Sequence, residues 1–234
     1  PPARLPRRWT PAGATCEHGT VRASVGARTV ERVSGDAHHE HHEAGPGTGF
    51  LTRPPPPVLR PYVRWVVAYD VDLGAPGVHL GLPSTALTLV LPVDEPLDVG
   101  WAAQPTSRVR RTSLASGLHT LPVEVRHSGW QTGVQVALTT AGAPALLGVP
   151  AAALAGELVG IPELDGPGRC AGLCHLPEQL HDTTDPWERI GLVERTLTAA
   201  LAQGGAAGPR AEVGRALSSL TRGAHVSEVA EDVG

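Results

Sequence analysis

Every second residue is apolar along residues 62–71 of the chain. Arg64 and Asp70 lie on one face of this segment, and the opposite face is entirely apolar, with Val63, Trp65, Val67, Tyr69 and Val71. A period of two is typical of a β-strand with one buried face. Further short apolar segments predict strands at 85–91, 97–102, 112–118, 123–127 and 130–138. Ser128-Gly129, between the last two, indicates a short hairpin turn. Strands this closely spaced predict an antiparallel sheet or a small barrel.

After Thr139 the apolar period becomes that of helices. Thr140 can cap a short helix that Gly148 stops, and residues 150–158 form a second weak pattern. A third helix follows from the stripe Leu173, Leu176 and Leu180, with Pro177 at its start or at a bend. These segments add helices to the sheet and predict an α+β fold.

The clearest helix of the chain begins at Asp185. Asp185 is a good N-cap, Pro186 suits the first helical position, and Glu188 completes the start signal. One face of the helix is apolar, with Ile190, Val193, Leu197, Ala200 and Leu201. Gly204-Gly205 ends it, and residues 203–208 have the composition of a linker between domains.

Two short helices follow this linker. The first begins at Pro209, ends at Gly223, and places four apolar residues on its inward side: Val213, Ala216, Leu217 and Leu220. The second has Val229, Ala230 and Val233 on its inward face and ends at Gly234, where a turn would need positive φ. A helix-turn-helix DNA reader has this order, so we expect a DNA-binding unit that stops before its recognition helix. A two-helix hairpin at the end of an ordinary domain is the alternative.

The first 57 residues show neither the strand period of two nor the helical period, and they contain a proline run at 54–57. A segment of this kind cannot bury enough apolar surface to offset its ordering entropy. We expect residues 1–57 to be a disordered leader or a stretch translated upstream of the true start, and favour the second because order begins abruptly after the prolines.

The overall charge and cysteine content bear on the class of protein. A net charge of −4 and a pI near 6.3 argue against a stand-alone nucleic-acid binder. Cys16, Cys170 and Cys174 do not make a disulfide framework, which favours a reducing, cytoplasmic location. We find no apolar run long enough to span a bilayer, and expect no membrane partner.

Four stretches of the chain resemble the N-terminal half of actinobacterial AraC-type regulators. They are LRPYVRWVVAYD (59–70), GVHLGLPSTALTLVLPVDEPL (77–97), SGLHTLPVEVRHSGWQTGVQVALTTAGAPALLGVPAAALAGELV (116–159) and VSEVAEDVG (226–234). The resemblance spans residues 58–234 and includes no catalytic signature. Regulators of the AraC/XylS type join a cupin-like, β-barrel effector domain through helices to a C-terminal pair of helix-turn-helix motifs.

The resemblance implies a division of the chain and a function. Residues 58–203 would sense an effector and dimerise, and residues 209–234 would begin a DNA-binding domain that is cut off before the recognition helix. The expected partners are an unknown small-molecule effector, a second copy in a homodimer and, in the full-length protein only, promoter DNA. The chain would not be an enzyme. A stand-alone cupin-like sensor of small molecules, without DNA function, is the alternative.

The candidate site residues follow from these expectations. His79, His119 and His127 lie in or beside predicted strands and could line an interior that holds one ligand. Our candidate effector pocket consists of Trp65, Tyr69, His79, Trp101 and His119, although each could be an ordinary core or surface residue. The candidate dimer face is Ile190, Val193, Leu197 and Leu201. The candidate DNA-binding scaffold is Val229, Ala230, Val233 and Gly234.

Two other clusters contain metal-binding residue types. The first is His38-His39-Glu40-His41-His42-Glu43, which lacks the zincin spacing and lies in the leader. The second, Cys170 and Cys174 with His175, offers at most two thiols on one helix, whereas a closed zinc site needs four ligands. We therefore expect no functional metal site and no cofactor. A metal-dependent enzyme built on the histidines is a distant alternative.

Overall fold

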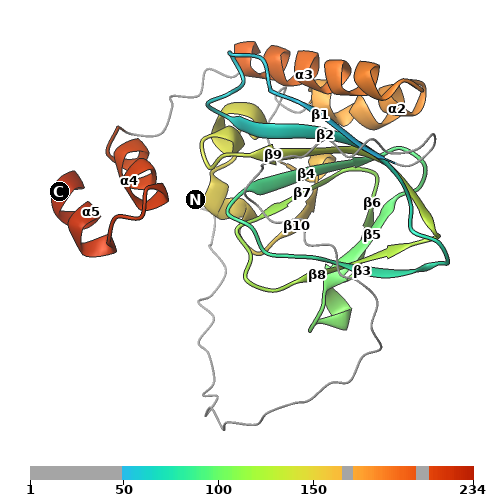
Figure 1. Cartoon of the computed structure of the whole chain (residues 1–234), viewed down its shortest axis with the longest axis horizontal. Coiled ribbons are helices and arrows are strands. Elements are labelled where there is room, and N and C mark those ends of the chain that lie inside the picture. Colours follow the sequence, from blue (N-terminus) through green and yellow to red (C-terminus); the bar gives the residue numbers. More distant parts are fainter. Residues whose placement is uncertain (1–48, 165–170, 204–210) are drawn as a thin grey trace, which may run out of the picture. The chain divides into compact units, whose positions relative to one another are not determined.

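The computed structural model describes residues 49–164, 171–203 and 211–234, and its fold belongs to the expected α+β class (Figure 1). A six-stranded sheet contains, in spatial order, β1 (Gly49–Arg53), β2 (Val63–Asp72), β9 (Trp130–Leu138), β4 (Leu87–Pro92), β7 (Leu114–Gly117) and β10 (Leu158–Gly160). A four-stranded sheet contains β3 (Gly77–Gly81), β8 (Val123–His127), β5 (Leu97–Trp101) and β6 (Val109–Arg111). Neighbouring strands are antiparallel in both sheets.

Helical segments follow the last long strand, as the sequence predicts. They are the π-helical η2 (Ala143–Leu147), the 3₁₀ turns η3 (Ala151–Leu154) and η4 (Ile161–Glu163), and the helices α1 (Ala171–Cys174), α2 (Leu176–His181) and α3 (Pro186–Gln203). A further 3₁₀ turn, η1 (Pro105–Ser107), lies between β5 and β6. The N-cap of α3 is confirmed, because the Glu188 N–H donates a 2.9 Å hydrogen bond to Asp185 Oδ2. The weak helix expected at 150–158 is only η3, and the chain then extends into β10.

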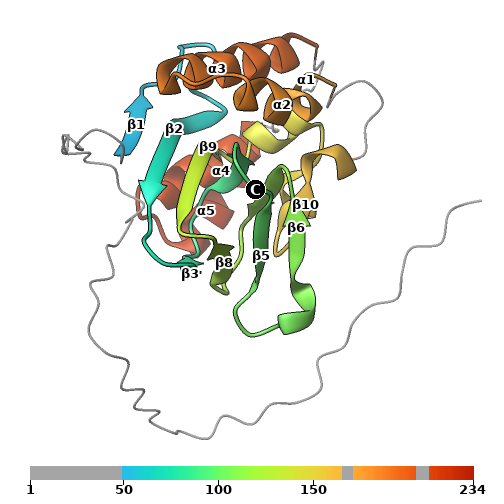
Figure 2. The same ribbon diagram turned by 90° about the vertical axis from the view of Figure 1, so that its right-hand side faces the viewer.

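The main core lies between the six-stranded sheet and these helices. Both views show α2 and α3 along one side of that sheet (Figures 1 and 2). Val66 and Ala68 of β2 are buried in this core, on the face opposite to the apolar alternation of the strand. A register shift between Val63 and Trp65 brings Val63 to the helix side as well. Both faces of β2 are therefore covered, which the period of two did not predict.

A smaller core lies between the inner faces of the two sheets. Its buried members are Leu97, Val99, Leu114 and Val123, and six-stranded-sheet residues Val90 and Leu158 pack against it. Cross-strand partners place their side chains on the same face, so this cluster identifies the inner face of every strand in register with it. No pairing between the described strands joins the two sheets into one closed ladder.

The hairpin expected at Ser128-Gly129 is not formed. β8 pairs with β3 and β5, whereas β9 pairs with β2 and β4, so the chain passes from one sheet to the other at this point. Gly129 has φ of 123°, and a Cβ there would lie 2.2 Å from the Gly74 carbonyl oxygen. The dipeptide therefore bends a long two-stranded ribbon, in which β2–β9 continues as β3–β8, rather than reversing the chain.

The folded region also begins earlier than residue 58. β1 pairs along its whole length with β2, for example Leu51 with Ala68. The boundary expected at residue 58 is therefore wrong for residues 49–53, because this strand gains its order from a partner and not from a period of its own. Residues 1–48, with the cluster His38–Glu43, lie outside the described residues. The sequence also missed β3, β6 and β10, which are only three to five residues long.

The two expected C-terminal helices are present as α4 (Ala211–Thr221) and α5 (Val226–Val233), and they pack on each other. Gly223 and Gly234 have the positive φ values expected of helix ends, 89° and 88°. Val229 is buried and Val233 half-buried, but Ala230 is exposed. The inward face predicted for α4 is wrong, because three of its four apolar residues are more than a third exposed: Val213, Leu217 and Leu220. In the described part of the chain, α4 packs on α5, and α5 leaves these side chains partly exposed.

Candidate functional site

The space between the sheets collects the polar and aromatic residues that the sequence singles out. On the four-stranded sheet, His79 is in register with Val125, which is in register with core residue Val99. His127 lies two residues from Val125, and Trp101 two residues from Val99, so both side chains share that inner face. Three ring side chains therefore face the interior from β3, β8 and β5.

The six-stranded sheet contributes the two remaining strand residues of the predicted pocket. Val67 is in register through Gln135 with Val90, which packs on the inner cluster. Trp65 and Tyr69 flank Val67 at a spacing of two and therefore face the same interior. Both are half-buried. The predicted pocket thus receives aromatic side chains from both sheets.

Tyr69 lies against a position where only glycine fits. It is in register with Gly133, and a Cβ on Gly133 would lie 2.4 Å from the Tyr69 hydroxyl. Burial raises the pKa of the Tyr69 phenol above its usual range, and the negative charge of Asp94 raises it further. The phenol is therefore neutral at physiological pH and can act as a hydrogen-bond donor or acceptor.

His119 belongs to the same site through Trp101. The two rings lie 5.1 Å apart, centroid to centroid. The His119 Nδ1 lies 2.7 Å from the Leu121 carbonyl oxygen, so Nδ1–H is the donor. Leu118, just before it, has φ of 49°, in the left-handed region that non-glycine residues seldom adopt. The strained turn after β7 therefore sets the position of His119 against Trp101.

Several buried polar atoms of the described residues have no protein partner, and those of His79, His127 and Ser116 lie on the inner faces of the sheets. The atoms without a partner are the Nδ1 atoms of His79 and His127, the hydroxyl oxygens of Ser113 and Ser116, and Nε of Arg111. Ser116 is in register with Thr88 and Leu158, on the inner face. An unpaired buried polar group costs about 1–3 kcal/mol, so such a set points to a bound ligand or water. Among the described residues, this set and the aromatic rings make the interior the best candidate site.

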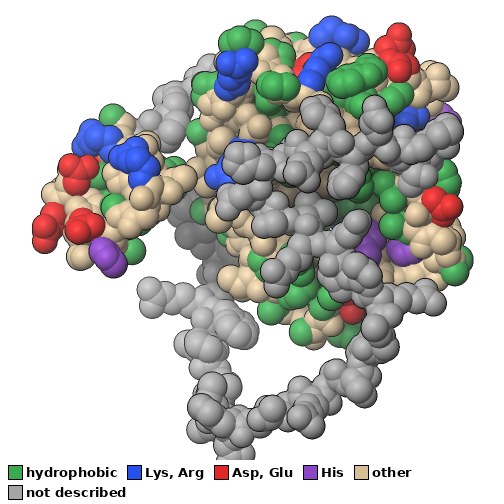
Figure 3. Space-filling model, viewed as in Figure 1, with side chains coloured by type: hydrophobic (Ala, Val, Ile, Leu, Met, Phe, Trp, Pro, Cys, Tyr) green, Lys and Arg blue, Asp and Glu red, His purple; other side chains and the backbone are tan. Residues whose placement is uncertain are grey.

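Neither His127, which lies in a predicted strand, nor Ser116 belongs to the candidate pocket predicted from the sequence. Their inward direction follows from strand register, which alternation alone could not supply for such short segments. In the space-filling view of Figure 3, histidine side chains (purple) lie beside hydrophobic side chains (green) on part of the surface.

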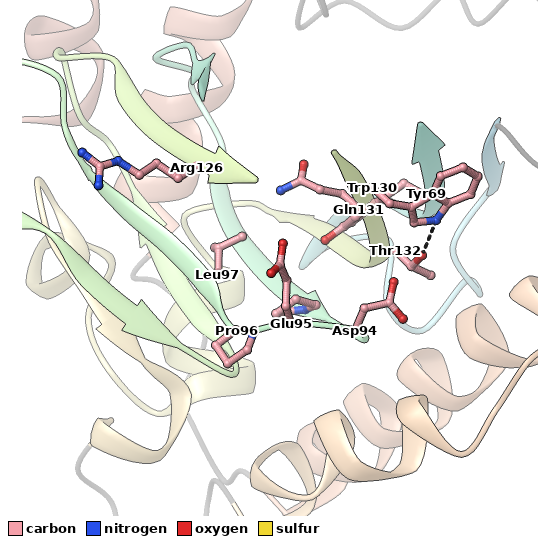
Figure 4. A pocket seen from close by; sticks show the side chains of 10 residues that line it. Tyr69, Asp94, Glu95, Pro96, Leu97, Arg126, Trp130, Gln131 and Thr132 are labelled. Atoms are coloured by element: carbon pink, nitrogen blue, oxygen red, sulfur yellow. Dashed lines mark hydrogen bonds between the residues drawn. The ribbon is translucent and has the colours of Figure 1, made fainter. Parts of the chain in front are cut away.

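A surface hollow lies near Tyr69, at the start of β9. Tyr69 itself lines the hollow, together with Asp94, Glu95 and Trp130, and there is room for about one water molecule. The Trp130 Nε1–H donates to Asp70 Oδ1 at 2.6 Å and to Thr132 Oγ1 at 3.2 Å. Figure 4 shows the indole beside Thr132. This hollow is too small to hold an effector.

The candidate dimer face on α3 is wrong. Ile190, Val193 and Leu197 are fully buried in the main core of the same chain, and Leu201 is half-buried against it. A second copy could not reach these side chains without removing α3 from the sheet. The apolar stripe of α3 therefore reports packing within the chain.

Metal-binding residue types do not gather into larger clusters in the described ranges. No group of three or more His, Cys, Asp or Glu side chains there could hold a metal ion. Cys174 is half-buried, and Cys170 lies outside the described residues. The His175 ring lies 3.8 Å from the Glu178 carboxylate, and both side chains are largely exposed.

Comparisons with protein-family models, curated proteins and solved structures found no match to this chain. The helices within the described ranges include none with both the length and the apolar character required to cross a membrane.

Proposed function

We propose that this chain is the effector-sensing part of an AraC-type transcription regulator, with a small molecule bound between the two sheets. The observation that carries the proposal is the interior lined by Trp101, His79 and His127, where buried ring nitrogens have no protein partner. Small-molecule sites usually combine apolar and aromatic side chains with a few convergent polar groups. The effector would place its apolar body against the aromatic rings and its polar groups against the histidines.

Strand β2 offers a route from this site to the rest of the chain. Trp65 and Tyr69 face the interior, while Val66 and Ala68 on the other side of the strand pack in the core that contains α3. α3 is the last element before the segment that leads to α4. A ligand that favours one position of β2 would therefore favour one packing of α3.

The DNA-binding part of the proposal rests on α4 and α5. Two short helices joined by a four-residue connection, with Val229 buried between them, have the order of the first helices of a helix-turn-helix unit. In this proposal the protein is cytoplasmic and dimeric, and its full-length form binds promoter DNA.

A gel shift with DNA upstream of the gene, using the whole gene product at fixed salt, tests this proposal, because non-specific binding varies steeply with salt. Val229→Asp should abolish specific binding by disrupting the helix pair. Val226→Asp, on the same helix but 74% exposed, should leave binding intact. Trp101→Ala should leave DNA binding intact and remove the response to effector in a reporter assay.

The same gel shift distinguishes the regulator from the alternative, a stand-alone sensor of small molecules. A whole gene product that shows no preference for this DNA over unrelated DNA would contradict the regulator and leave a stand-alone sensor of small molecules.

A further inference from the structure

His79 and His127 form a pair across two neighbouring antiparallel strands. His127 is in register with Gly77, two residues from His79, so the imidazoles are diagonal neighbours on one face. Their ring centroids lie 5.7 Å apart, with 32° between the ring planes. Gly77 leaves room for this arrangement, because a Cβ there would already lie 3.3 Å from His127 Nε2.

Neither ring is held by a hydrogen bond at Nδ1. Both Nδ1 atoms are buried and lack a protein partner, unlike Nδ1 of His119 and His181, which lie near carbonyl oxygens. A neutral imidazole with a free nitrogen is the form that binds metal ions.

The spacing of the rings fits one shared ion. A metal about 2.0–2.1 Å from a ring nitrogen lies about 3.2 Å from that ring's centroid, so two rings at a tetrahedral angle have centroids about 5.2 Å apart. The observed 5.7 Å is close enough for small side-chain rotations to complete the geometry.

We propose that His79 and His127 form a two-histidine site for a borderline transition-metal ion such as Cu²⁺, Ni²⁺ or Zn²⁺. Imidazole suits these ions, and Cu²⁺ binds most tightly among them. The described residues offer no third clustered protein ligand, so water or a small ligand fills the other positions. The ion is therefore exchangeable, unlike a structural zinc with four protein ligands. This ion would occupy the ring nitrogens that also face the proposed effector, so an effector would meet the ion in place of the free imidazoles; the metal site does not depend on the proposed DNA function.

The test is a calorimetric titration with Cu²⁺ in a chain whose leader histidines are removed as competing ligands (His18→Gln, His38→Gln, His39→Gln, His41→Gln and His42→Gln) and whose cysteines, which would bind or reduce Cu²⁺, are replaced (Cys16→Ser, Cys170→Ser and Cys174→Ser). This parent protein should bind one ion per chain. His79→Gln and His127→Gln should each weaken binding at least about tenfold, since even the loss of a group that only orients a ligand costs 10–100-fold. His175→Gln, at a largely exposed ring, should bind as the parent does.

Electron paramagnetic resonance of the Cu²⁺-loaded parent gives a readout that needs no substitution in the site. Hyperfine coupling to two imidazole nitrogens supports the pair, and coupling to one nitrogen or none overturns it. Equal Cu²⁺ affinity in the parent and the doubly substituted protein also overturns it. Circular dichroism of each variant shows whether weaker Cu²⁺ binding results from loss of the fold. If a variant is unfolded, the paramagnetic resonance spectrum of the Cu²⁺-loaded parent decides.

Discussion

Arg53 of β1 and Glu194 of α3 form a two-pronged ion pair that ties the first strand to the longest helix. Nε of Arg53 lies 3.1 Å from Oε2 and 3.3 Å from Oε1 of Glu194, and the Arg53 Nη2 donates a further hydrogen bond to Oε2. The Glu194 side chain is only 6% exposed, whereas that of Arg53 is 41% exposed. The buried carboxylate therefore depends on the arginine more than the arginine depends on it.

Removal of either partner should expose this asymmetry. We expect Arg53→Ala to destabilise the fold by about 2–4 kcal/mol, because it leaves a buried carboxylate unpaired. Glu194→Gln should cost less, about 1–2 kcal/mol, since Arg53 can be hydrated. Glu188→Gln, at an exposed position on α3, is the control. Denaturant unfolding measures all three, and equal losses for Arg53→Ala and Glu188→Gln would contradict the importance of the pair.

The substitution Val193→Asp distinguishes packing of α3 in the core of its own chain from a contact of α3 with a second copy. Val193 is fully buried, so Val193→Asp should destabilise the fold by more than about 4 kcal/mol and cause loss of α3 packing. Ala199→Asp, at an exposed position on the same helix, should change stability by less than about 0.5 kcal/mol. Thermal unfolding and a size measurement test this. A folded Val193→Asp protein that only changes from dimer to monomer would restore the dimer face.

Alanine substitutions at two glycines in the bend of the β2–β9 ribbon compare the cost of a steric clash with the cost of positive φ alone. Gly129 and Gly74 both have positive φ, but only at Gly129 would a Cβ meet another atom, the Gly74 carbonyl oxygen. Gly74→Ala should therefore cost about 1 kcal/mol and Gly129→Ala at least about 3 kcal/mol. Unfolding midpoints give both values. Similar losses at the two positions would show that the close approach does not matter.

The buried His79 should make stability depend on pH. Its pKa is below 6.5 in the folded protein because of burial and the nearby His127, so the unfolded chain binds a proton first as the pH falls. The His79 contribution is fully present above about pH 7 and decreases as the pH falls through 6.5 toward the lowered pKa. His79→Gln should flatten this part of the stability curve, measured by denaturant midpoints from about pH 7.5 to 5. A His79→Gln curve parallel to that of the wild type would contradict the prediction.

Local chemistry determined several elements before any tertiary contact is considered. The start of α3 is set by Asp185, Pro186 and Glu188. Gly148, with φ of 71°, ends the short helical segment η2. Of the ten strands within the described residues, six coincide with apolar alternation or apolar runs. The α+β class follows from these, because caps, turn glycines and periods depend only on neighbouring residues.

Only the tertiary structure decided which strands pair and which faces are covered. Residues 49–53 become β1 because β2 offers an open edge, and Ser128-Gly129 becomes a bend because β8 and β9 pair with different strands. The stripe of α3 faces its own sheet and not a second copy, and His127 joins His79 only through the register of β3 with β8. A sequence pattern shows that a face is apolar or that a histidine lies on a strand. The partner of that face or histidine depends on residues far away along the chain, which only the folded structure brings together.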